Sequence, residues 1–213
     1  MKTYGWHEIG SVPAAPGVYA WYYIPEITHF DLREMKSEVE TLKSQGKTDQ
    51  AKASLRQFLD RMIFRYFREQ PYETRLKGAL KPRYEGMIAH VPMLSESLIE
   101  RLVENPARLD TIRDVLQASA PGFSSPLYIG MSERLKFRLA RHKTLIERYS
   151  EIPVGDDDSQ DGRDHSFARE IHSRSIPPTR LFVVVNVIDD SHGTYVDIEN
   201  ILNRIHYPLL GRN

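Results

Sequence analysis

The sequence contains no cysteine among its 213 residues. Disulfides, zinc–thiolate sites and cysteine nucleophiles are therefore excluded. It also contains no apolar run of the roughly 18 residues that a membrane-spanning helix requires. The first residues, Met1–Trp6, lack the apolar core of a secretory signal. Together these absences favour a cytoplasmic protein that does not enter a membrane.

The chain also lacks net charge, because 29 Lys and Arg residues balance 29 Asp and Glu residues. The charges are nevertheless unevenly distributed. Residues 47–83 contain ten basic and four acidic side chains, and residues 132–148 contain six and two. Residues 151–164 contain six acids and one arginine, without the glycine and glutamate spacing of a calcium loop, which indicates a solvated loop. Because phosphate contacts depend on local charge excess, the neutral total does not exclude nucleic-acid binding.

Hydrophobic periodicity predicts an α/β protein. Strands are predicted over 17–24, 83–91 and 181–188, and the nearly continuous apolar run of the last is typical of a central strand. Helices are predicted over 31–46, 49–70, 95–104, 106–118, 132–149, 165–174 and 194–206.

The predicted elements divide the chain into two parts. Residues 1–25 and 126–213 form a small core with a short mixed or antiparallel sheet flanked by helices. Residues 26–125 form a large, mostly helical insertion for recognition or dimerisation. Within the helix predicted over 49–70, arginines lie opposite the apolar stripe, and this side is either a solvated polar face or a ridge that follows phosphates. These arginines are Arg61, Arg65 and Arg68.

Two short strings far apart in the chain each lie in a β-branched and aromatic run that is typical of a strand. One is Pro16-Gly17-Val18-Tyr19, and the other is Leu127-Tyr128-Ile129-Gly130. The second leads directly into a basic helix. Arg138 and His142 lie on that helix, ten and fourteen residues after Tyr128, and at i and i+4 they share a face. This face borders an apolar stripe, so we expect both side chains to be half-buried.

The last predicted helix contains one candidate metal-binding carboxylate, Glu199. It is expected to lie beside a buried stripe formed by Ile198, Ile201, Leu202 and Ile205. Asn203 lies on the same side of the helix as Glu199. A single carboxylate completed by water and substrate oxygens suits Mg²⁺.

Two tyrosines, an arginine, a histidine and a carboxylate together match the needs of phosphodiester hydrolysis. That reaction requires an activated water, neutralisation of growing negative charge and help for the leaving oxygen. An arginine can hold a phosphate through its planar guanidinium group. The pattern predicts a hydrolase that acts on phosphodiesters.

These residues and their spacing resemble the GIY-YIG nuclease family, and the arginine-to-histidine spacing resembles its restriction-endonuclease branch. The resemblance covers the two flanks of the chain and implies a GIY-YIG-like core. It implies that Tyr19 orients or deprotonates the attacking water and that Tyr128 supports the water or the phosphate. It also implies that Arg138 stabilises charge in the transition state, that His142 belongs to the site, and that Glu199 holds one Mg²⁺ or Mn²⁺.

The sequence departs from this family in three places. About 100 residues separate the two tyrosine motifs, which a short turn normally joins. Met131 stands where excision-repair relatives often have lysine. Gly211 stands where restriction-type relatives have asparagine, so either Asn203 or Asn213 is the candidate for that supporting role.

The resemblance leads us to expect a divalent-metal-dependent endonuclease that cuts DNA, in restriction or phage defence. The expected DNA contacts are Arg61, Arg65, Arg68, Arg134 and Arg141. Cutting both strands with one active site per chain favours a homodimer, stable or formed on DNA. Two alternatives stay open: a non-catalytic nucleic-acid-binding or regulatory module on the same fold, and a nuclease that acts on RNA or branched DNA.

Each candidate residue also has a plainer interpretation when it is taken singly. Tyr19 and Tyr128 are then strand aromatics that pack a core, because tyrosine is frequent in strands. Arg138 is then a surface cation, and Glu199 a solvated helix residue. His142, beside an apolar stripe, is then a hydrogen-bonded core histidine.

Overall fold

The computed structural model of the protein describes residues 1–68, 72–78, 81–88, 93–119, 122–151, 163–188 and 193–210. The acidic segment over 152–162 and the candidate Asn213 lie outside these residues. The chain forms two compact units, one built from Met1–Glu26 with Arg113–Asn213 and the other from Ile27–Ile112. The second boundary therefore lies at Ile112, within a helix, instead of at the predicted residue 125.

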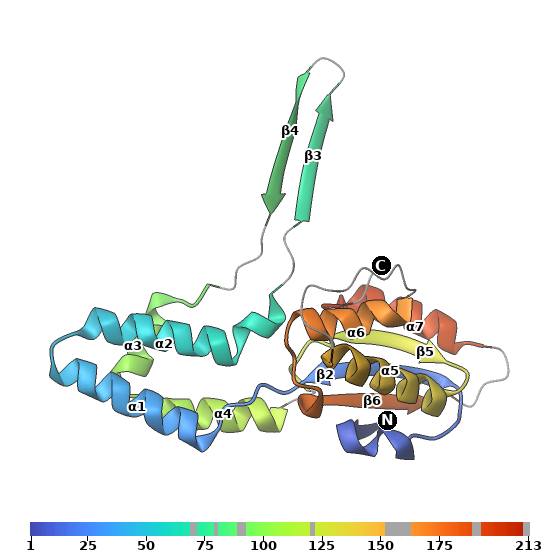
Figure 1. The fold of residues 1–213 in the computed structure, drawn as a ribbon, viewed down its shortest axis with the longest axis horizontal. Coiled ribbons are helices and arrows are strands. Elements are labelled where there is room, and N and C mark those ends of the chain that lie inside the picture. The colour runs from blue at the N-terminus through green and yellow to red at the C-terminus, as the bar shows by residue number, and fades with distance from the viewer. Residues whose placement is uncertain are drawn as a thin grey trace. The chain divides into compact units, whose positions relative to one another are not determined.

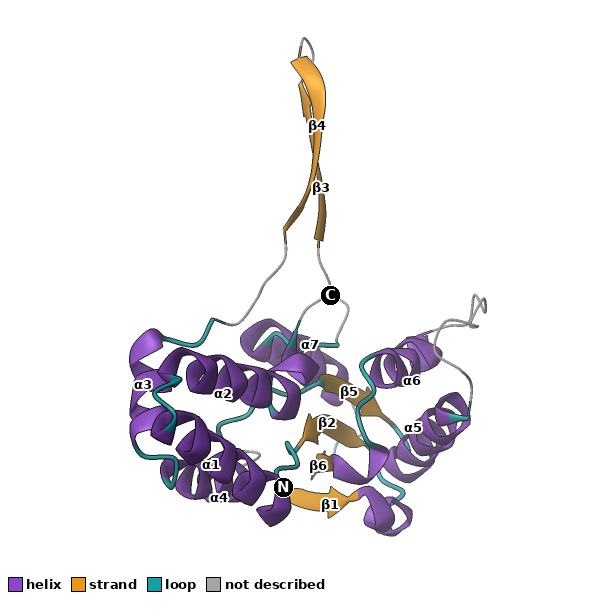
Figure 2. Ribbon diagram, turned by 60° about the vertical axis from the view of Figure 1, so that its left-hand side comes forward, coloured by secondary structure: helices purple, strands orange, loops and turns teal. Residues whose placement is uncertain are grey.

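The first unit contains a four-stranded sheet in the order β1-β6-β2-β5, in which every pair is antiparallel. The strands are β1 (Lys2–Gly5), β2 (Gly17–Tyr23), β5 (Tyr128–Ser132) and β6 (Leu181–Val187) (Figure 1; β1 is labelled in Figure 2). The predicted central position of β6 is confirmed, because it pairs with β1 on one side and β2 on the other. Strand β1 was not predicted, since four residues are too few to show a period of two.

Three α-helices surround this sheet. Helices α5 (Leu135–Ser150) and α6 (Arg163–Ser173) pack against each other, and α5 contacts β2 and β5. Helix α7 (Tyr195–His206) packs beside β5 and β2 (Figure 2). The described residues of this unit also form two 3-10 helices, η1 (Trp6–Ser11) and η3 (Pro178–Arg180).

The second unit is built on four α-helices. These are α1 (His29–Ser44), α2 (Thr48–Met62), α3 (Glu96–Glu104) and α4 (Arg108–Ser119), the last of which continues into the first unit. Helix α1 begins with a capping box between Thr28 and Asp31, and α2 packs against both α1 and α3.

Lys52 on α2 donates hydrogen bonds to the carboxylates of Glu96 and Glu100 on α3, both at 3.0 Å. These bonds, led by the one to Glu100, raise the pKa of Lys52, and the bond from Lys52 lowers the pKa of Glu96.

The helix predicted over 49–70 is shorter than expected, because α2 ends at Met62 and a 3-10 helix, η2 (Phe64–Phe67), follows. Aromatic side chains lose rotamer freedom against the preceding helical turn, which disfavours continuation through this run. Arg65 and Arg68 therefore lie beyond α2, and the single helix face expected to carry them with Arg61 is not formed. The contact of these arginines with DNA stays a prediction. The Arg65 guanidinium stacks on the Tyr66 ring at 4.5 Å, and Arg68 pairs with Asp60.

The second unit also contains a hairpin that the sequence revealed only in part. Strand β4 (Lys81–Ile88) overlaps the strand predicted over 83–91, and its partner β3 (Tyr72–Gly78) was missed. Within the described part of the chain, the two strands pair only with each other. Along β3 the charged Glu73, Arg75 and Lys77 alternate with other residues, but the segment contains too few apolar residues to be recognised as a strand. No helix in the described residues is both long and apolar enough to cross a bilayer.

Candidate active site

Tyr19 lies at the centre of the candidate site. Its hydroxyl oxygen accepts a hydrogen bond from Nε of Arg138 at 3.2 Å and lies 3.3 Å from Nε2 of His142. Arg138 and His142 stand one turn apart on α5, as their spacing predicted. The fold therefore brings residues more than 100 positions apart into one hydrogen-bonded group.

The beginning of α5 is anchored to the segment that precedes β2. The backbone N–H groups of Leu135 and Lys136 donate to the carbonyls of Ala15 and Pro13, at 3.0 and 3.3 Å. These are among the donors at a helix N-terminus that lack a partner within the helix. The bonds fix the first turn of α5 against the entry to β2, and Arg138 follows in that turn.

Gly17 allows this close approach. A Cβ at Gly17 would lie 2.2 Å from the backbone oxygen of Asn186 and 2.9 Å from Cδ1 of Leu135. Any side chain there would separate β2 from β6 and push α5 away from the sheet. The glycine of the first motif is thus required by packing.

Gly130 has a comparable role on β5, where it pairs directly with Tyr19. A Cβ at Gly130 would lie 2.6 Å from the hydroxyl oxygen of Tyr19 and 2.8 Å from Cε1 of Tyr128. The absent side chain gives both tyrosines their space. This explains physically why glycine follows two residues after Tyr128.

Two aromatic residues that the sequence analysis did not select enclose the group. The Phe167 ring of α6 lies 5.0 Å from the Tyr128 ring and 5.4 Å from the His142 ring, between centroids. The Trp21 ring stacks on His142 at 6.4 Å. Trp21 follows Tyr19 by two residues and so shares its face of β2, which was a usable signal. Nothing local pointed to Phe167.

Burial divides the site into an inner pair, Tyr19 and His142, and an outer pair, Tyr128 and Arg138. Only 2% of Tyr19 and 1% of His142 is exposed, whereas Tyr128 and Arg138 are half-buried. The expectation of a half-buried position holds for Arg138 and is wrong for His142, which lies within the buried stripe of α5 and not at its border. Solvent, and hence any substrate, reaches Arg138 and Tyr128 before the inner pair.

Glu199 lies on α7, which is attached to both ends of β5. The Tyr195 hydroxyl donates to Oε1 of Glu133 at 3.2 Å, and the Leu210 N–H donates to the Leu127 carbonyl at 2.7 Å. These two contacts place α7 alongside the strand that carries Tyr128.

The half-buried Glu199 is fixed by its own helix. Nδ2 of Asn203, one turn later, donates to Oε1 of Glu199 at 2.8 Å. In the part of the chain that the structure describes, Glu199 forms no direct hydrogen bond or ion pair with Tyr19, Arg138 or His142. Asn203 is therefore placed to orient the carboxylate, and Asn213 lies outside the described residues.

The buried stripe predicted on α7 is wrong. Ile201 is 56% exposed and Ile205 is 62% exposed, while Ile198 and Leu202 are half-buried and Tyr195 is buried. Strand β5 is the edge of its sheet, so the helix beside it covers less of its own apolar surface than a helix over a sheet centre. The hydrophobic periodicity correctly predicted a helix here, but it overestimated how much of the apolar face of that helix is buried.

The remaining predicted DNA contacts of this unit are accessible. Arg134 and Arg141 are both exposed, Arg134 at the beginning of α5 and Arg141 within it. The Arg134 guanidinium lies 5.9 Å from the Phe137 ring. Both cations thus belong to the helix that carries Arg138.

The described residues do not gather three or more His, Asp or Glu side chains that could together hold a metal ion. The carboxylate of Glu199 offers hard oxygen atoms, the ligand type that Mg²⁺ prefers. One protein carboxylate can suffice, because Mg²⁺ usually completes its coordination shell with water and substrate phosphate. The donor chemistry therefore fits a cation shared with a phosphodiester.

Comparison with known proteins gave no match to any family model, curated protein or solved structure. The assignment of function consequently depends on the geometry described above.

Proposed function

We propose that this protein is a divalent-metal-dependent endonuclease of the GIY-YIG type that hydrolyses DNA, in restriction or defence against phage. One observation carries the proposal: the Tyr19 hydroxyl contacts both Arg138 and His142, in the residue types and spacing that the resemblance implies. Taken singly, each residue has a plain packing explanation. A buried phenol that contacts both a guanidinium and an imidazole is harder to explain by packing.

The proposed mechanism begins with a proton relay through the inner pair. Because Arg138 donates to the Tyr19 oxygen, the hydroxyl hydrogen is directed to another acceptor. Nε2 of a neutral His142 at 3.3 Å is such an acceptor. As Tyr19 passes its proton to His142, its oxygen takes a proton from the attacking water. The guanidinium beside it favours the phenolate form.

The outer pair would meet the phosphate. The half-buried Arg138 holds a phosphate oxygen and stabilises the charge that develops in the transition state. Tyr128, whose ring lies 6.2 Å from the Tyr19 ring between centroids, supports the water or the phosphate. Glu199, oriented by Asn203, would hold Mg²⁺ or Mn²⁺, which when bound would neutralise charge at the scissile phosphate.

A second candidate is a nucleic-acid-binding module without catalysis. It is favoured by the burial of Tyr19 and by the position of Glu199, whose carboxylate bonds Asn203 of its own helix. In that case the contact between Tyr19 and His142 stabilises the fold, and Arg138 contributes only to phosphate binding.

Plasmid cleavage tests the proposal. Supercoiled DNA, a branched DNA and an RNA are incubated with the protein in Mg²⁺, in Mn²⁺ or in EDTA. We expect nicking or linearisation of the plasmid that depends on the metal and falls by a factor of about 100 or more in Glu199→Ala, because one charge-stabilising group is lost. Gel electrophoresis over time measures the rate.

Asp197→Ala provides the matched control, since Asp197 is an exposed carboxylate two residues earlier on the same helix. It should cleave at the wild-type rate. Full cleavage by Glu199→Ala would refute the assignment of this glutamate. Metal-independent binding without cleavage of any of the three substrates would favour the binding module.

A further inference from the structure

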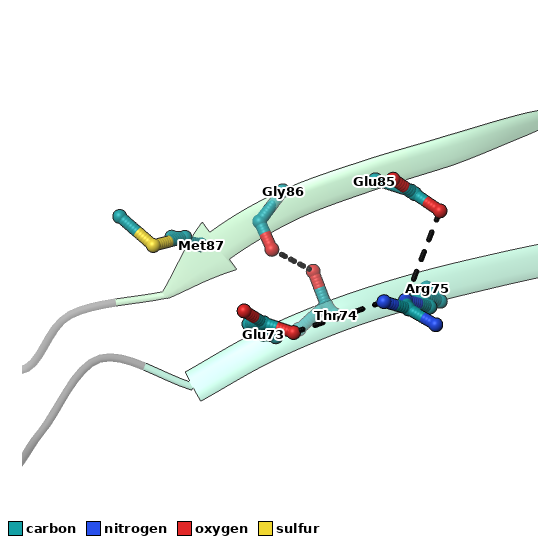
Figure 3. A pocket seen from close by; sticks show the side chains of 6 residues that line it. All are labelled: Glu73, Thr74, Arg75, Glu85, Gly86 and Met87. Carbon is teal, nitrogen blue, oxygen red and sulfur yellow. Dashed lines mark hydrogen bonds and ion pairs between the residues drawn. The ribbon is translucent and has the colours of Figure 1, made fainter.

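The β3–β4 hairpin has surfaces that nothing in the described structure covers. All of its side chains that the structure describes are exposed except Thr74, which is half-buried. The hydroxyl of Thr74 donates to the Gly86 carbonyl across the strands at 3.1 Å (Figure 3). A two-stranded hairpin without a supporting layer is only marginally stable in water. This argues that the hairpin gains part of its stability from a partner.

The charges of the hairpin are separated along its length. Arg75 lies 3.7 Å from Glu85, directly opposite on β4, and 3.9 Å from Glu73 on its own strand. These three residues line a surface depression together with Thr74, Gly86 and Met87 (Figure 3). The acids therefore compensate the arginine at this level of the hairpin.

Between Arg75 and Glu85, every charged residue of the sequence is a cation. Residues 76–84 contain Lys77, Lys81 and Arg83 and no acid. Lys77 belongs to β3, and Lys81 and Arg83 belong to β4, so the backbone brings all three to the same end of one narrow ribbon. That end has a local charge of +3 and suits a polyanion.

We propose that the β3–β4 hairpin is a DNA-binding ribbon that enters the major groove of the duplex. The major groove of B-DNA, about 12 Å wide, admits a two-stranded ribbon. At about 3.4 Å per residue, the seven residues of β3 extend about 24 Å, enough to place the cationic end at the phosphates. A-form RNA is a poorer partner, because its major groove is deep and narrow.

This inference deepens the proposed function by naming the element that holds the substrate, and it depends on DNA being that substrate. It adds the hairpin to the predicted DNA contacts Arg61, Arg65 and Arg68, which do not share one face of α2. The alternative partner is a protein strand that pairs with an open edge of the hairpin. The positive charge of Lys77, Lys81 and Arg83 favours the polyanion over that alternative.

Fluorescence anisotropy of a labelled duplex, titrated with the full chain in EDTA at several salt concentrations, tests the inference without requiring cleavage. The variant Lys77→Gln/Lys81→Gln/Arg83→Gln should reduce the slope of log affinity against log salt by about 2 to 3, since each phosphate contact contributes about 0.9. Affinity at about 0.1 M salt should fall by roughly tens to hundreds of fold. Circular dichroism confirms that the variant is folded.

The matched control neutralises three exposed cations on the helices of the same unit, Arg33, Arg101 and Arg108, each changed to Gln. It should retain the wild-type slope. Equal slopes for the hairpin variant and the wild type would overturn the inference while leaving the nuclease proposal intact. A reduced slope in a protein that cuts no substrate would support the ribbon and refute the nuclease. A wild-type chain that binds no duplex but pairs with a second copy through the hairpin would also overturn the inference.

Discussion

The absence of side chains at Gly17 and Gly130 is as important to the candidate site as the polar groups themselves. Gly130 leaves room for the Tyr19 hydroxyl, which then reaches both Arg138 and His142. The ring of Phe167 packs against the rings of Tyr128 and His142. At the scale of single residues, the geometry of Tyr19 therefore depends on packing by neighbours that perform no chemistry.

Gly130→Ala should displace the Tyr19 ring and disturb its bonds to Arg138 and His142. The new Cβ would stand 2.6 Å from the hydroxyl oxygen, well inside van der Waals contact. We expect overpacking to destabilise the fold by about 1–3 kcal/mol and plasmid cleavage to fall by at least about tenfold. Thermal denaturation and the cleavage assay measure the two effects.

Gly10→Ala is the control for this substitution, because no heavy atom lies within 4 Å of the Cβ that it would add. Stability and cleavage should both stay near wild type. An unchanged cleavage rate in Gly130→Ala would show that the position of the Tyr19 hydroxyl does not limit the reaction.

At the scale of elements, the sheet depends on how closely β2 approaches β6. Gly17 pairs with Val187 on β6 and with Ser132 on β5, and its Cα faces the first turn of α5. The two strands and the helix meet at this residue. The same junction sets the position of Arg138, three residues after Leu135.

Gly17→Ala should break this junction. The added Cβ would collide with a backbone oxygen, which cannot rotate away, so we expect a loss of stability of more than about 3 kcal/mol or failure to fold. Chemical denaturation measures the loss. Gly5→Ala, on β1 in the same sheet, should cost little, since its nearest neighbour is a flexible Glu8 side chain at 3.4 Å. Equal losses for the two variants would contradict the argument.

At the scale of the whole molecule, the protein consists of two units with separate cores. The core of the first is the sheet with its helices, and Val183 of β6 is fully buried in it. The core of the second lies among α1, α2 and α3, where Leu55 is fully buried. We therefore expect a core substitution in one unit to lower the stability of that unit and leave the other unchanged.

Leu55→Ala should therefore loosen one unit and spare the other. Removing a fully buried leucine side chain costs about 2–5 kcal/mol. Hydrogen exchange monitored by mass spectrometry should become faster across α1, α2 and α3 and stay unchanged across β2 and β6. Val183→Ala should give the reverse pattern. Faster exchange in both units after either substitution would show that they unfold as one cooperative body.

Much of the fold and part of the site were predictable from the sequence. Period and composition located β2, β5, β6 and most of the helices, because the residue pattern that marks each element lies within a few neighbouring positions of the chain. The pairing of Arg138 with His142 on one helix face was predictable for the same reason. The hairpin partner β3 was missed because it contains few apolar residues. The early end of α2 was missed because an aromatic run overrides the helical period.

What only the tertiary structure decided is the meeting of residues distant in the chain. Tyr19 and Arg138 are 119 positions apart, and no local pattern places the phenol against the guanidinium. The same holds for Phe167 against His142, for the gap at Gly130 and for the exposure of Ile201 and Ile205. Residue types and their spacing set the possible chemistry, whereas the close packing of strands and helices decided which groups touch and which remain in solvent.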